Sequence, residues 1–289
     1  MYKKTRYKIL VTGSTGFIGN YVINELLKSK KRVIATSRRS KAEVSHGWLN
    51  NVEYIEADLG DEKDDWFNFF NKPNLLIHLA WEGLPNYKDS FHLEQNLPNH
   101  YSFIKNMVES GLKKVIVTGT CFEYGIQNGN LKENLMTKPN NAYALAKDKL
   151  RKSLEKMQKK IDYDLTWIRL FYTYGRKQNP NSILSLLDAA IERGDKVFNM
   201  SNGDQLRDYL PVDKVAEYIV KISLQNKVNS IINCCSGKPI SIRKLVENYL
   251  SVEKKHIELN FGYYSQLDYE PIAFWGDTEK LNIVLSKSL

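Results

Sequence analysis

The sequence is poor in features that define several classes of protein. Cysteine is scarce: there are 3 in 289 residues (Cys121, Cys234 and Cys235), without paired spacing, which argues against a disulfide scaffold and predicts a reducing compartment. No apolar run approaches the ~20 residues of a membrane-spanning helix. The apolar stretch near the N-terminus covers only Ile9 to Val11, far short of the roughly 7–15 residues of a secretory signal. We therefore expect a cytoplasmic protein that does not enter a membrane.

Clusters of histidine and cysteine with metal-ligand spacing are also missing, so we expect no structural metal. Basic residues outnumber acidic ones by 42 to 33, which gives a net charge of +9. The lysines are spread along the chain, and no basic segment carries interleaved aromatic residues. Nucleic-acid binding is therefore not expected. The excess charge either covers a solvated surface or attracts polyanionic small molecules.

Apolar, strand-like runs alternate with amphipathic segments, and this alternation predicts a Rossmann-type α/β fold with a doubly wound parallel sheet. The expected strands are 7–12, 32–37, 52–57, 74–80, 114–119 and 164–171, and the expected helices are 17–29, 63–71, 90–110 and 143–160. Beyond residue 172 helices at 182–193, 213–224 and 241–250 flank short strand-like pieces such as 230–235. We predict a dinucleotide-binding domain over 1–172 and a smaller mixed α/β substrate lobe over 173–289, with some crossing of the chain between them.

The segment VTGSTGFIGN places Gly13, Gly16 and Gly19 between the first strand and the first helix. Glycines at this point let the backbone turn sharply and approach a pyrophosphate, while the helix N-terminus supplies amide groups. The position directly after a strand and before a helix favours a dinucleotide site over an ordinary glycine turn.

Two arginines follow the second strand where an NAD site would show an acidic residue for the ribose. Arg38 and Arg39 could hold a 2′-phosphate through charge-assisted hydrogen bonds. The alternative is a pair of solvated surface arginines. We therefore favour NADP(H) over NAD(H).

The spacing Tyr-x-x-x-Lys, which puts both side chains on one face of a helix, occurs twice. The two matches are Tyr101 with Lys105 and Tyr143 with Lys147. Only the second follows a strand that ends in threonines, Thr118 and Thr120, where a parallel sheet lines its ligand crevice. We expect Tyr143 to pass a proton to a substrate oxygen that Thr120 also hydrogen-bonds. Lys147, together with an oxidised nicotinamide, should lower the pKa of this phenol from about 10.

Several motifs together make the chain similar to the extended short-chain dehydrogenase/reductases that act on sugar nucleotides as epimerases, dehydratases and reductases. The similarity covers nearly the whole chain. Its markers are TGSTGFIG (12–19), ADL (57–59), HLA (78–80), Asn96, TGTCFEYG (118–125), YALAK (143–147), RLFYTYG (169–175) and RDYLPVDKVA (207–216). The resemblance implies a nicotinamide dinucleotide cofactor, a nucleotide-diphosphate sugar as substrate and a homodimer.

On this resemblance the catalytic residues are Thr120, Tyr143 and Lys147. The implied cofactor-binding residues are Gly13, Thr15, Gly16, Phe17, Ile18, Gly19, Ser37, Arg38, Arg39, Asp58, Leu59, Leu79, Ala80, Trp81, Asn96, Thr118, Lys147 and Tyr172. The implied substrate-binding residues are Trp81, Tyr87, Thr120, Cys121, Phe122, Tyr143, Tyr172, Asn181 and Arg207. Trp81 and Tyr87 either stack on the sugar or base or pack within their loop. Arg207 either grips the diphosphate or forms a salt bridge between the lobes with Asp208 or Asp213.

Departures from the family pattern narrow the expected reaction. Cys121 and Phe122 stand where sugar-nucleotide 4,6-dehydratases carry Asp-Glu, so the elimination of water lacks its acid–base pair. Glu123 comes one residue later and should point elsewhere on an extended segment. Tyr172 stands where epimerases often carry asparagine.

The loop WEGLPNY (81–87) and the signature GTCFEYG (119–125) resemble a group of reductases. The group includes dTDP-4-dehydro-6-deoxyglucose reductases that form dTDP-fucose, and CDP-abequose or CDP-paratose synthases. We therefore expect NADPH-dependent reduction of the 4-keto group of a nucleotide-linked 4-keto-6-deoxy sugar. The alternatives are a 4-epimerase with retained NAD and a non-catalytic NADP-binding regulatory protein.

Overall fold

A parallel sheet of seven strands forms the centre of the computed structural model, which describes residues 7–226, 228–265 and 271–286. Its spatial order is β12-β7-β5-β4-β1-β2-β3. The strands are β1 (Lys8–Thr12), β2 (Arg32–Ser37), β3 (Glu53–Glu56), β4 (Leu75–His78), β5 (Lys114–Thr120), β7 (Asp164–Leu170) and β12 (Ile231–Cys234). The predicted doubly wound α/β fold is confirmed, and six of these strands coincide with predicted ones to within a few residues.

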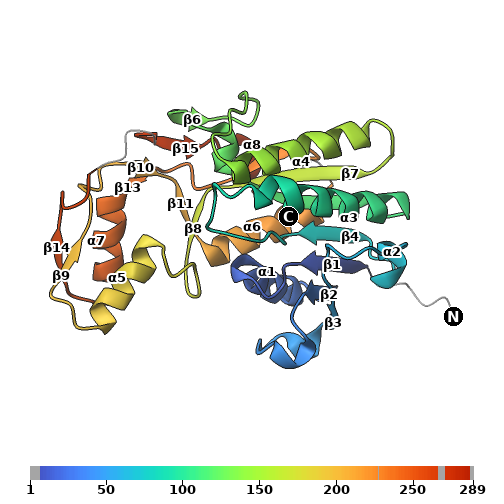
Figure 1. The fold of residues 1–289 in the computed structure, drawn as a ribbon, viewed down its shortest axis with the longest axis horizontal. Helices are drawn as coiled ribbons and strands as arrows, with labels where there is room; N and C mark the ends of the chain where they lie inside the picture. Colours follow the sequence, from blue (N-terminus) through green and yellow to red (C-terminus); the bar gives the residue numbers. More distant parts are fainter. Residues whose placement is uncertain (1–6, 227, 266–270, 287–289) are drawn as a thin grey trace.

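Helices cover both faces of the sheet, because successive strand residues point to opposite sides. Ile9 and Val11 of β1 pack into the core on one face, and Leu10 packs into the core on the other. The first face carries α1 (Phe17–Lys28), α6 (Val212–Leu224) and α8 (Glu279–Leu285). The second face carries α2 (Trp66–Phe69), the π-helix η3 (His92–Asn96), α3 (Leu97–Glu109) and α4 (Ala142–Gln158). Figure 1 shows α3 beside α4 in the upper part of this domain and α1 beside α6 lower in the same view.

The second lobe lies beyond the carboxyl ends of the strands, at the left of Figure 1. Its helices are α5 (Ile183–Glu192) and α7 (Ile242–Glu253), and its strand pairs are β9 (Val197–Asn199) with β14 (Glu258–Asn260) and β10 (Leu206–Arg207) with β13 (Ile240–Ser241). Leu184, Leu187, Met200, Leu245 and Val246 form its buried core. Two further pairs lie beside the sheet: β8 (Tyr172–Tyr174) with β11 (Tyr209–Pro211), and β6 (Gly129–Leu131) with β15 (Phe274–Gly276). The remaining short turns are the 3-10 helices η1 (Lys41–Glu43), η2 (Leu49–Asn51) and η4 (Cys121–Tyr124).

One assignment to the second lobe is wrong. The strand-like piece 230–235 is β12, which pairs in parallel with β7 at the edge of the main sheet. Helix α6, although it lies beyond residue 172, packs with α1 on the same face. The apolar run predicted a strand, but its partner lies more than 60 residues away, and local pattern does not identify such partners. The chain thus crosses between lobes, and the boundary near residue 172 stays a prediction. Within the described residues, no helix has the length and apolar character needed to span a bilayer.

A buried ion pair joins the end of β5 to β7. Glu123 in η4 is fully buried, and its carboxylate accepts hydrogen bonds from the Thr120 amide at 2.9 Å, the Trp167 indole at 2.9 Å and the Arg169 Nε at 2.8 Å. The expectation of an extended segment at Glu123 is wrong: residues Cys121–Tyr124 form the 3-10 helix η4, and the Glu123 carboxylate turns back to the Thr120 amide. Because Glu123 bonds the backbone of Thr120, it fixes the strand end where Thr120 stands.

Replacing Glu123 with glutamine tests this anchor. Glutamine keeps an acceptor for the Thr120 amide but leaves the buried Arg169 guanidinium without its counter-charge. We expect the free energy of unfolding to fall by about 3–5 kcal/mol, as is typical when one partner of a buried ion pair is removed. The fall is measured from the urea midpoint. Glu155→Gln is the matched control, because Glu155 pairs with Arg151 but has 39% of its side chain exposed, and the expected loss is about 0–1 kcal/mol. Equal midpoints for the two variants would contradict the assignment.

Candidate active site

The turn between β1 and α1 requires glycine at two positions. Gly13 has a φ of +68°, and a Cβ there would come within 2.8 Å of the Ala80 amide nitrogen. A Cβ on Gly19 would lie 2.1 Å from the Gly13 carbonyl oxygen. The turn therefore brings the first strand, the first helix and the end of β4 into close backbone contact. Helix α1 begins directly after Gly16 at the end of this turn. The backbone amides of a helix N-terminus are suited to bind an anion such as a phosphate.

Two adjoining cavities, of about 260 and 350 Å³, follow the carboxyl ends of β1, β2, β3 and β4, and we call them together the cofactor groove. Of the predicted cofactor-binding residues, the groove is lined by Gly13, Thr15, Gly16, Ser37, Arg38, Arg39, Asp58, Leu59, Ala80, Trp81 and Asn96. Phe17, Ile18 and Gly19 open helix α1, whereas Leu79 packs against the apolar core. The Thr118 hydroxyl donates to the His78 carbonyl at 3.3 Å, and Tyr172 lies in β8.

Both arginines of the second strand end line the cofactor groove. Arg38 forms an ion pair with Glu82 at 2.9 Å, with 57% of its side chain exposed. The Arg39 carbonyl accepts a hydrogen bond from the Tyr54 hydroxyl at 2.6 Å, and the same hydroxyl lies 2.7 Å from the Ser37 Oγ. Both arginines thus line the groove, and the Arg38 guanidinium already has an acidic partner in Glu82.

Of the two Tyr-x-x-x-Lys matches, only the pair on α4 reaches the strand-end threonines. Asn141 caps α4 by accepting the Ala144 amide at 2.9 Å, and the Tyr143 amide donates to the Tyr87 carbonyl at 2.9 Å. The side chains of Tyr143 and Lys147 are 8% and 2% exposed.

The polar atoms of this pair meet the end of β5. The Lys147 Nζ donates to the Thr118 carbonyl at 2.9 Å, and the Thr120 hydroxyl lies near enough to Tyr143 to lower the pKa of the phenol. On α3, by contrast, Lys105 pairs with Glu109 and Tyr101 packs against the apolar core. The residues predicted as catalytic are thus brought together, and the second match is not part of this cluster.

In the chain by itself Lys147 is not among the main groups that set the pKa of Tyr143, and the lowering expected from Lys147 together with an oxidised nicotinamide stays a prediction. Burial raises the pKa of Tyr143 above its ordinary value, the charges of Tyr87, Glu123 and Cys121 raise it further, and the nearby Thr120 hydroxyl opposes this by lowering it. Burial also lowers the pKa of Lys147 to about 7, against the opposing effect of Glu123. A proton on Tyr143 is therefore strongly held.

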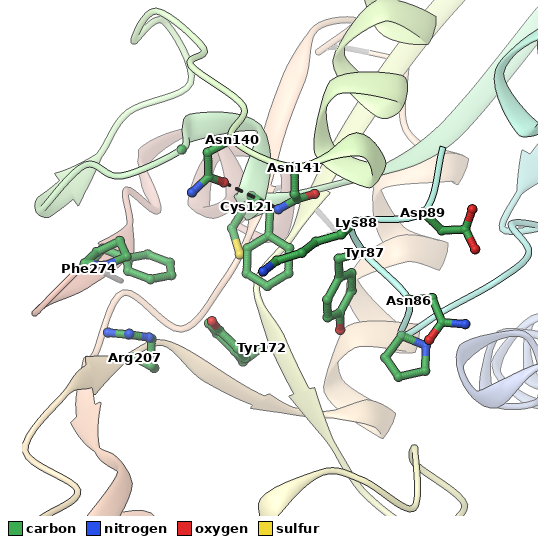
Figure 2. A pocket seen from close by; sticks show the side chains of 14 residues that line it. Asn86, Tyr87, Lys88, Asp89, Cys121, Asn140, Asn141, Tyr172, Arg207 and Phe274 are labelled. Atoms are coloured by element: carbon green, nitrogen blue, oxygen red, sulfur yellow. Dashed lines mark hydrogen bonds between the residues drawn. The ribbon is translucent and has the colours of Figure 1, made fainter. Parts of the chain in front are cut away.

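A cavity of about 760 Å³, which we call the substrate cavity, opens beside Tyr143. Figure 2 shows Arg207 and Phe274 on one wall, Asn86, Tyr87, Lys88 and Asp89 on the opposite wall, and Asn140 and Asn141 between them. The Tyr87 ring lies 5.6 Å from the Tyr143 ring and 5.3 Å from Phe122. Such a mixture of aromatic faces and cationic groups suits a ligand with a ring and phosphates.

Five of the nine predicted substrate-binding residues line the substrate cavity: Tyr87, Cys121, Phe122, Tyr172 and Arg207. Trp81 lines the cofactor groove instead. Thr120 and Tyr143 lie buried behind Tyr87 and Phe122. Asn181 is an exposed residue before α5, outside the lining of the cavity, and its contact with substrate stays a prediction.

Arg207 enters the substrate cavity from a buried position on β10. Its guanidinium lies 4.9 Å from the Phe274 ring centroid and donates to the Leu206 carbonyl at 3.0 Å. Asp208, one of the two acids proposed to clamp it, accepts hydrogen bonds from the amides of Ser236 at 2.7 Å and Gly237 at 2.9 Å. The Asp208 carboxylate therefore stabilises the backbone turn at Ser236 and Gly237.

Several lining residues were not predicted from the sequence. Phe274 lies about 100 residues beyond Tyr172 and more than 150 beyond Phe122 and Tyr87, the other aromatic residues that line the cavity, and nothing local marks it. Asn141 could have been found as an N-cap before an amphipathic helix. His92, for which the sequence suggests no role, is fully buried and lies 5.4 Å from the Tyr143 ring.

Comparison with known proteins agrees with this geometry. Residues 9–235 match the model of the NAD dependent epimerase/dehydratase family. A dTDP-6-deoxy-L-talose 4-dehydrogenase (NAD(+)) of Aggregatibacter actinomycetemcomitans is 31% identical over 272 residues, which cover 93% of this chain and 98% of that protein. A UDP-glucose 4-epimerase of Halalkalibacterium halodurans is 26% identical, covering 83% of this chain and 78% of its own length.

The fold also matches a solved structure. MoeE5 in complex with UDP-glucuronic acid and NAD has a TM-score of 0.80 and 22% identity, and the match covers 96% of this chain and 92% of that one. The predicted resemblance to sugar-nucleotide short-chain dehydrogenase/reductases is confirmed at the level of the family. The protein is a member of the NAD dependent epimerase/dehydratase family, whose relatives modify nucleotide sugars.

Proposed function

We propose that the protein reduces the 4-keto group of a nucleotide-linked 4-keto-6-deoxy sugar with a nicotinamide cofactor. One observation carries this proposal: the buried cluster of Thr120, Tyr143 and Lys147 lies between the two cavities. The Tyr143 ring lies 6.1 Å from the Trp81 ring of the cofactor groove and 5.6 Å from the Tyr87 ring of the substrate cavity.

When bound, a reduced nicotinamide supplies the hydride for this reaction. Tyr143 donates its proton to the forming alkoxide, and the Thr120 hydroxyl hydrogen-bonds the same oxygen. Burial raises the pKa of Tyr143, so the phenol carries its proton before the reaction, and the forming alkoxide, which is the stronger base, takes that proton. Lys147 holds the ribose side of the cofactor and places a positive charge beneath the developing anion.

The proposed cofactor is NADP(H), with NAD(H) as the alternative. Arg38 and Arg39 in the cofactor groove support it, because guanidiniums recognise a 2′-phosphate. The name of the relative that is 31% identical specifies NAD(+), so the choice between the two cofactors is the first thing to measure.

The proposed substrate is dTDP-4-dehydro-6-deoxyglucose, with dTDP-fucose as the product. The relative named for dTDP-6-deoxy-L-talose supports a dTDP-linked 6-deoxyhexose handled at carbon 4. Epimerases among the relatives make a 4-epimerase with retained NAD the second candidate.

An assay of cofactor oxidation separates the two candidates, with 4-keto-6-deoxy sugars linked to dTDP, CDP, UDP and GDP as the substrates. Net oxidation with one of them supports the reductase, whereas interconversion of two sugars without net oxidation supports the epimerase. We further propose a cytoplasmic homodimer, to be checked by light scattering.

Removing the Tyr143 hydroxyl tests the proposed acid. Tyr143→Phe keeps the ring, so folding and cofactor binding should survive while turnover falls by about 10²–10⁴, the usual scale for a lost general acid. Tyr101→Phe on α3 is the matched control and should leave turnover unchanged. If the Tyr101 variant lost its turnover and the Tyr143 variant kept it, the assignment would be reversed.

Removing both arginines of the cofactor groove tests the cofactor. The double variant Arg38→Ala/Arg39→Ala should bind NADPH at least tenfold more weakly, because charge-assisted bonds contribute about 1.5–3 kcal/mol each. NADH binding should change little, since NADH has no 2′-phosphate. Arg32→Ala, at the other end of β2 and paired with Glu53, is the control. Equal affinity of the unmodified protein for NADPH and NADH, measured by titration calorimetry, contradicts the proposal.

Replacing Arg207 separates its two possible roles. If it grips a diphosphate, Arg207→Ala raises the substrate KM at least tenfold and leaves NADPH affinity unchanged, with part of the loss in turnover because remote binding energy positions the keto carbon. If Arg207 only joins the two lobes, the substitution lowers the melting temperature and leaves the substrate KM unchanged. Melting curves and substrate titrations on the same variant decide between the two.

A further inference from the structure

The ammonium of Lys147 is buried without an ion pair. Among residues 7–226, 228–265 and 271–286, no carboxylate lies within 4.0 Å of its Nζ. Its two close contacts are the Thr118 carbonyl at 2.9 Å and the face of the Trp81 indole, whose centroid is 3.9 Å away. A buried charge needs such compensation, and an indole face attracts a cation through its quadrupole. Trp81 is thus the aromatic group that faces the lysine.

The Trp81 ring is itself held in place. Its indole N–H donates to the Nδ1 of His92 at 3.2 Å, and its ring stacks on His100 with 4.8 Å between centroids. Because an indole N–H can only donate, the Nδ1 of His92 must accept, and the proton of His92 is on Nε2. That proton points to the Asn86 carbonyl, 3.1 Å away. Asn96 adds a second donor to the same Nδ1 at 3.1 Å.

The other charged and titratable groups that the structure describes around Lys147 are held by hydrogen bonds or ion pairs or are neutral, so none of them supplies a free counter-charge. His78 of β4 and His100 of α3 hydrogen-bond each other at 2.9 Å. Burial lowers the pKa of both, that of His100 to about 3, so they are neutral. Burial also lowers the pKa of His92, and Glu123 is engaged by Arg169. On α4 itself, Tyr143 is protonated, and Asp148 pairs with Arg151 and Lys152.

We propose that Trp81 is a positioning residue that keeps the Lys147 ammonium charged and directed into the site, and that His92 holds Trp81 in this orientation. The role differs from the stacking on sugar or base that the sequence suggested for Trp81. The pair of Trp81 and His92 also links the two cavities: Trp81 lines the cofactor groove, and His92 hydrogen-bonds the carbonyl of Asn86, which lines the substrate cavity. The catalytic consequence rests on the proposed function, but the effect on the lysine does not.

The effect on Lys147 can be measured without turnover. Lysines labelled with ¹³C at Cε are titrated by NMR, and the resonance of Lys147 is assigned from its absence in Lys147→Met. In the unmodified protein it should titrate near pH 7, in agreement with the lowered pKa. Trp81→Leu removes the aromatic face that favours the charged form, so the titration should move at least about half a pH unit lower. Trp81→Phe should move it less, because phenylalanine keeps a weaker face.

Two further variants address His92. His92→Gln keeps an acceptor for the indole N–H and should behave like the unmodified protein, whereas His92→Leu should move the titration in the same direction as Trp81→Leu. Trp66→Phe is the matched control, since Trp66 packs in the same apolar cluster as Trp81 and also has a lysine, Lys63, 5.2 Å from its ring. It should leave Lys147 unchanged. If Trp81→Leu does not fold, Trp81→Phe and His92→Leu carry the same test.

Kinetics give the second readout. With a substrate identified, Trp81→Leu should lower kcat at least tenfold with less than about a threefold change in substrate KM, and the alkaline limb of kcat/KM should move to lower pH. A Trp81→Leu variant whose lysine titration is unchanged or raised overturns the proposal and leaves Trp81 as packing alone. A lowered titration in a protein that reduces no nucleotide sugar keeps the role of Trp81 and rejects the proposed function.

Discussion

The site depends on the burial of one positive charge, the Lys147 ammonium, at the carboxyl end of β5. Placing a cation there without an ion-pair partner is unfavourable unless every nearby group is arranged for it. The Thr118 carbonyl, the Trp81 face and the neutral histidines His78 and His100 are so arranged. The same burial holds the proton on Tyr143, so the acid and the cation belong to one desolvated cluster.

The topology of the sheet explains why this cluster lies between two cavities. The strand order changes direction between β1 and β4, and ligands of such sheets bind in the crevice at that point. The glycine turn after β1 opens the cofactor groove on one side of the crevice. On the other side of the crevice, the second lobe contributes Arg207 of β10 to the lining of the substrate cavity. Helix α4 places the Tyr143 ring beside Trp81 of the groove and Tyr87 of the cavity, and the Tyr143 amide donates to the Tyr87 carbonyl.

Local pattern predicted much of this structure. Strand and helix bounds followed from apolar periodicity and glycine positions, and the strand-end threonines distinguished Tyr143 from Tyr101. Most residues predicted to bind the cofactor do line its groove, because they lie at strand ends that a parallel sheet must bring to one edge.

What the sequence did not reveal depends on distance along the chain and on burial. The pairing of β12 with β7 and the arrival of Phe274 in the cavity are contacts between distant segments. The raised pKa of Tyr143 is a consequence of desolvation, which spacing on a helix does not report. Likewise the roles that we propose for Trp81 and His92 follow only from the three-dimensional contacts of their rings.

The central claim is that the cluster moves a hydride from the cofactor to carbon 4 of a sugar with net oxidation of the cofactor. The most direct measurement uses cofactor deuterated at carbon 4 of its nicotinamide, with the released nucleotide sugar analysed by NMR. The account predicts one deuterium at carbon 4 of the sugar for each cofactor oxidised. A sugar that is converted to its 4-epimer without deuterium from added cofactor would contradict it.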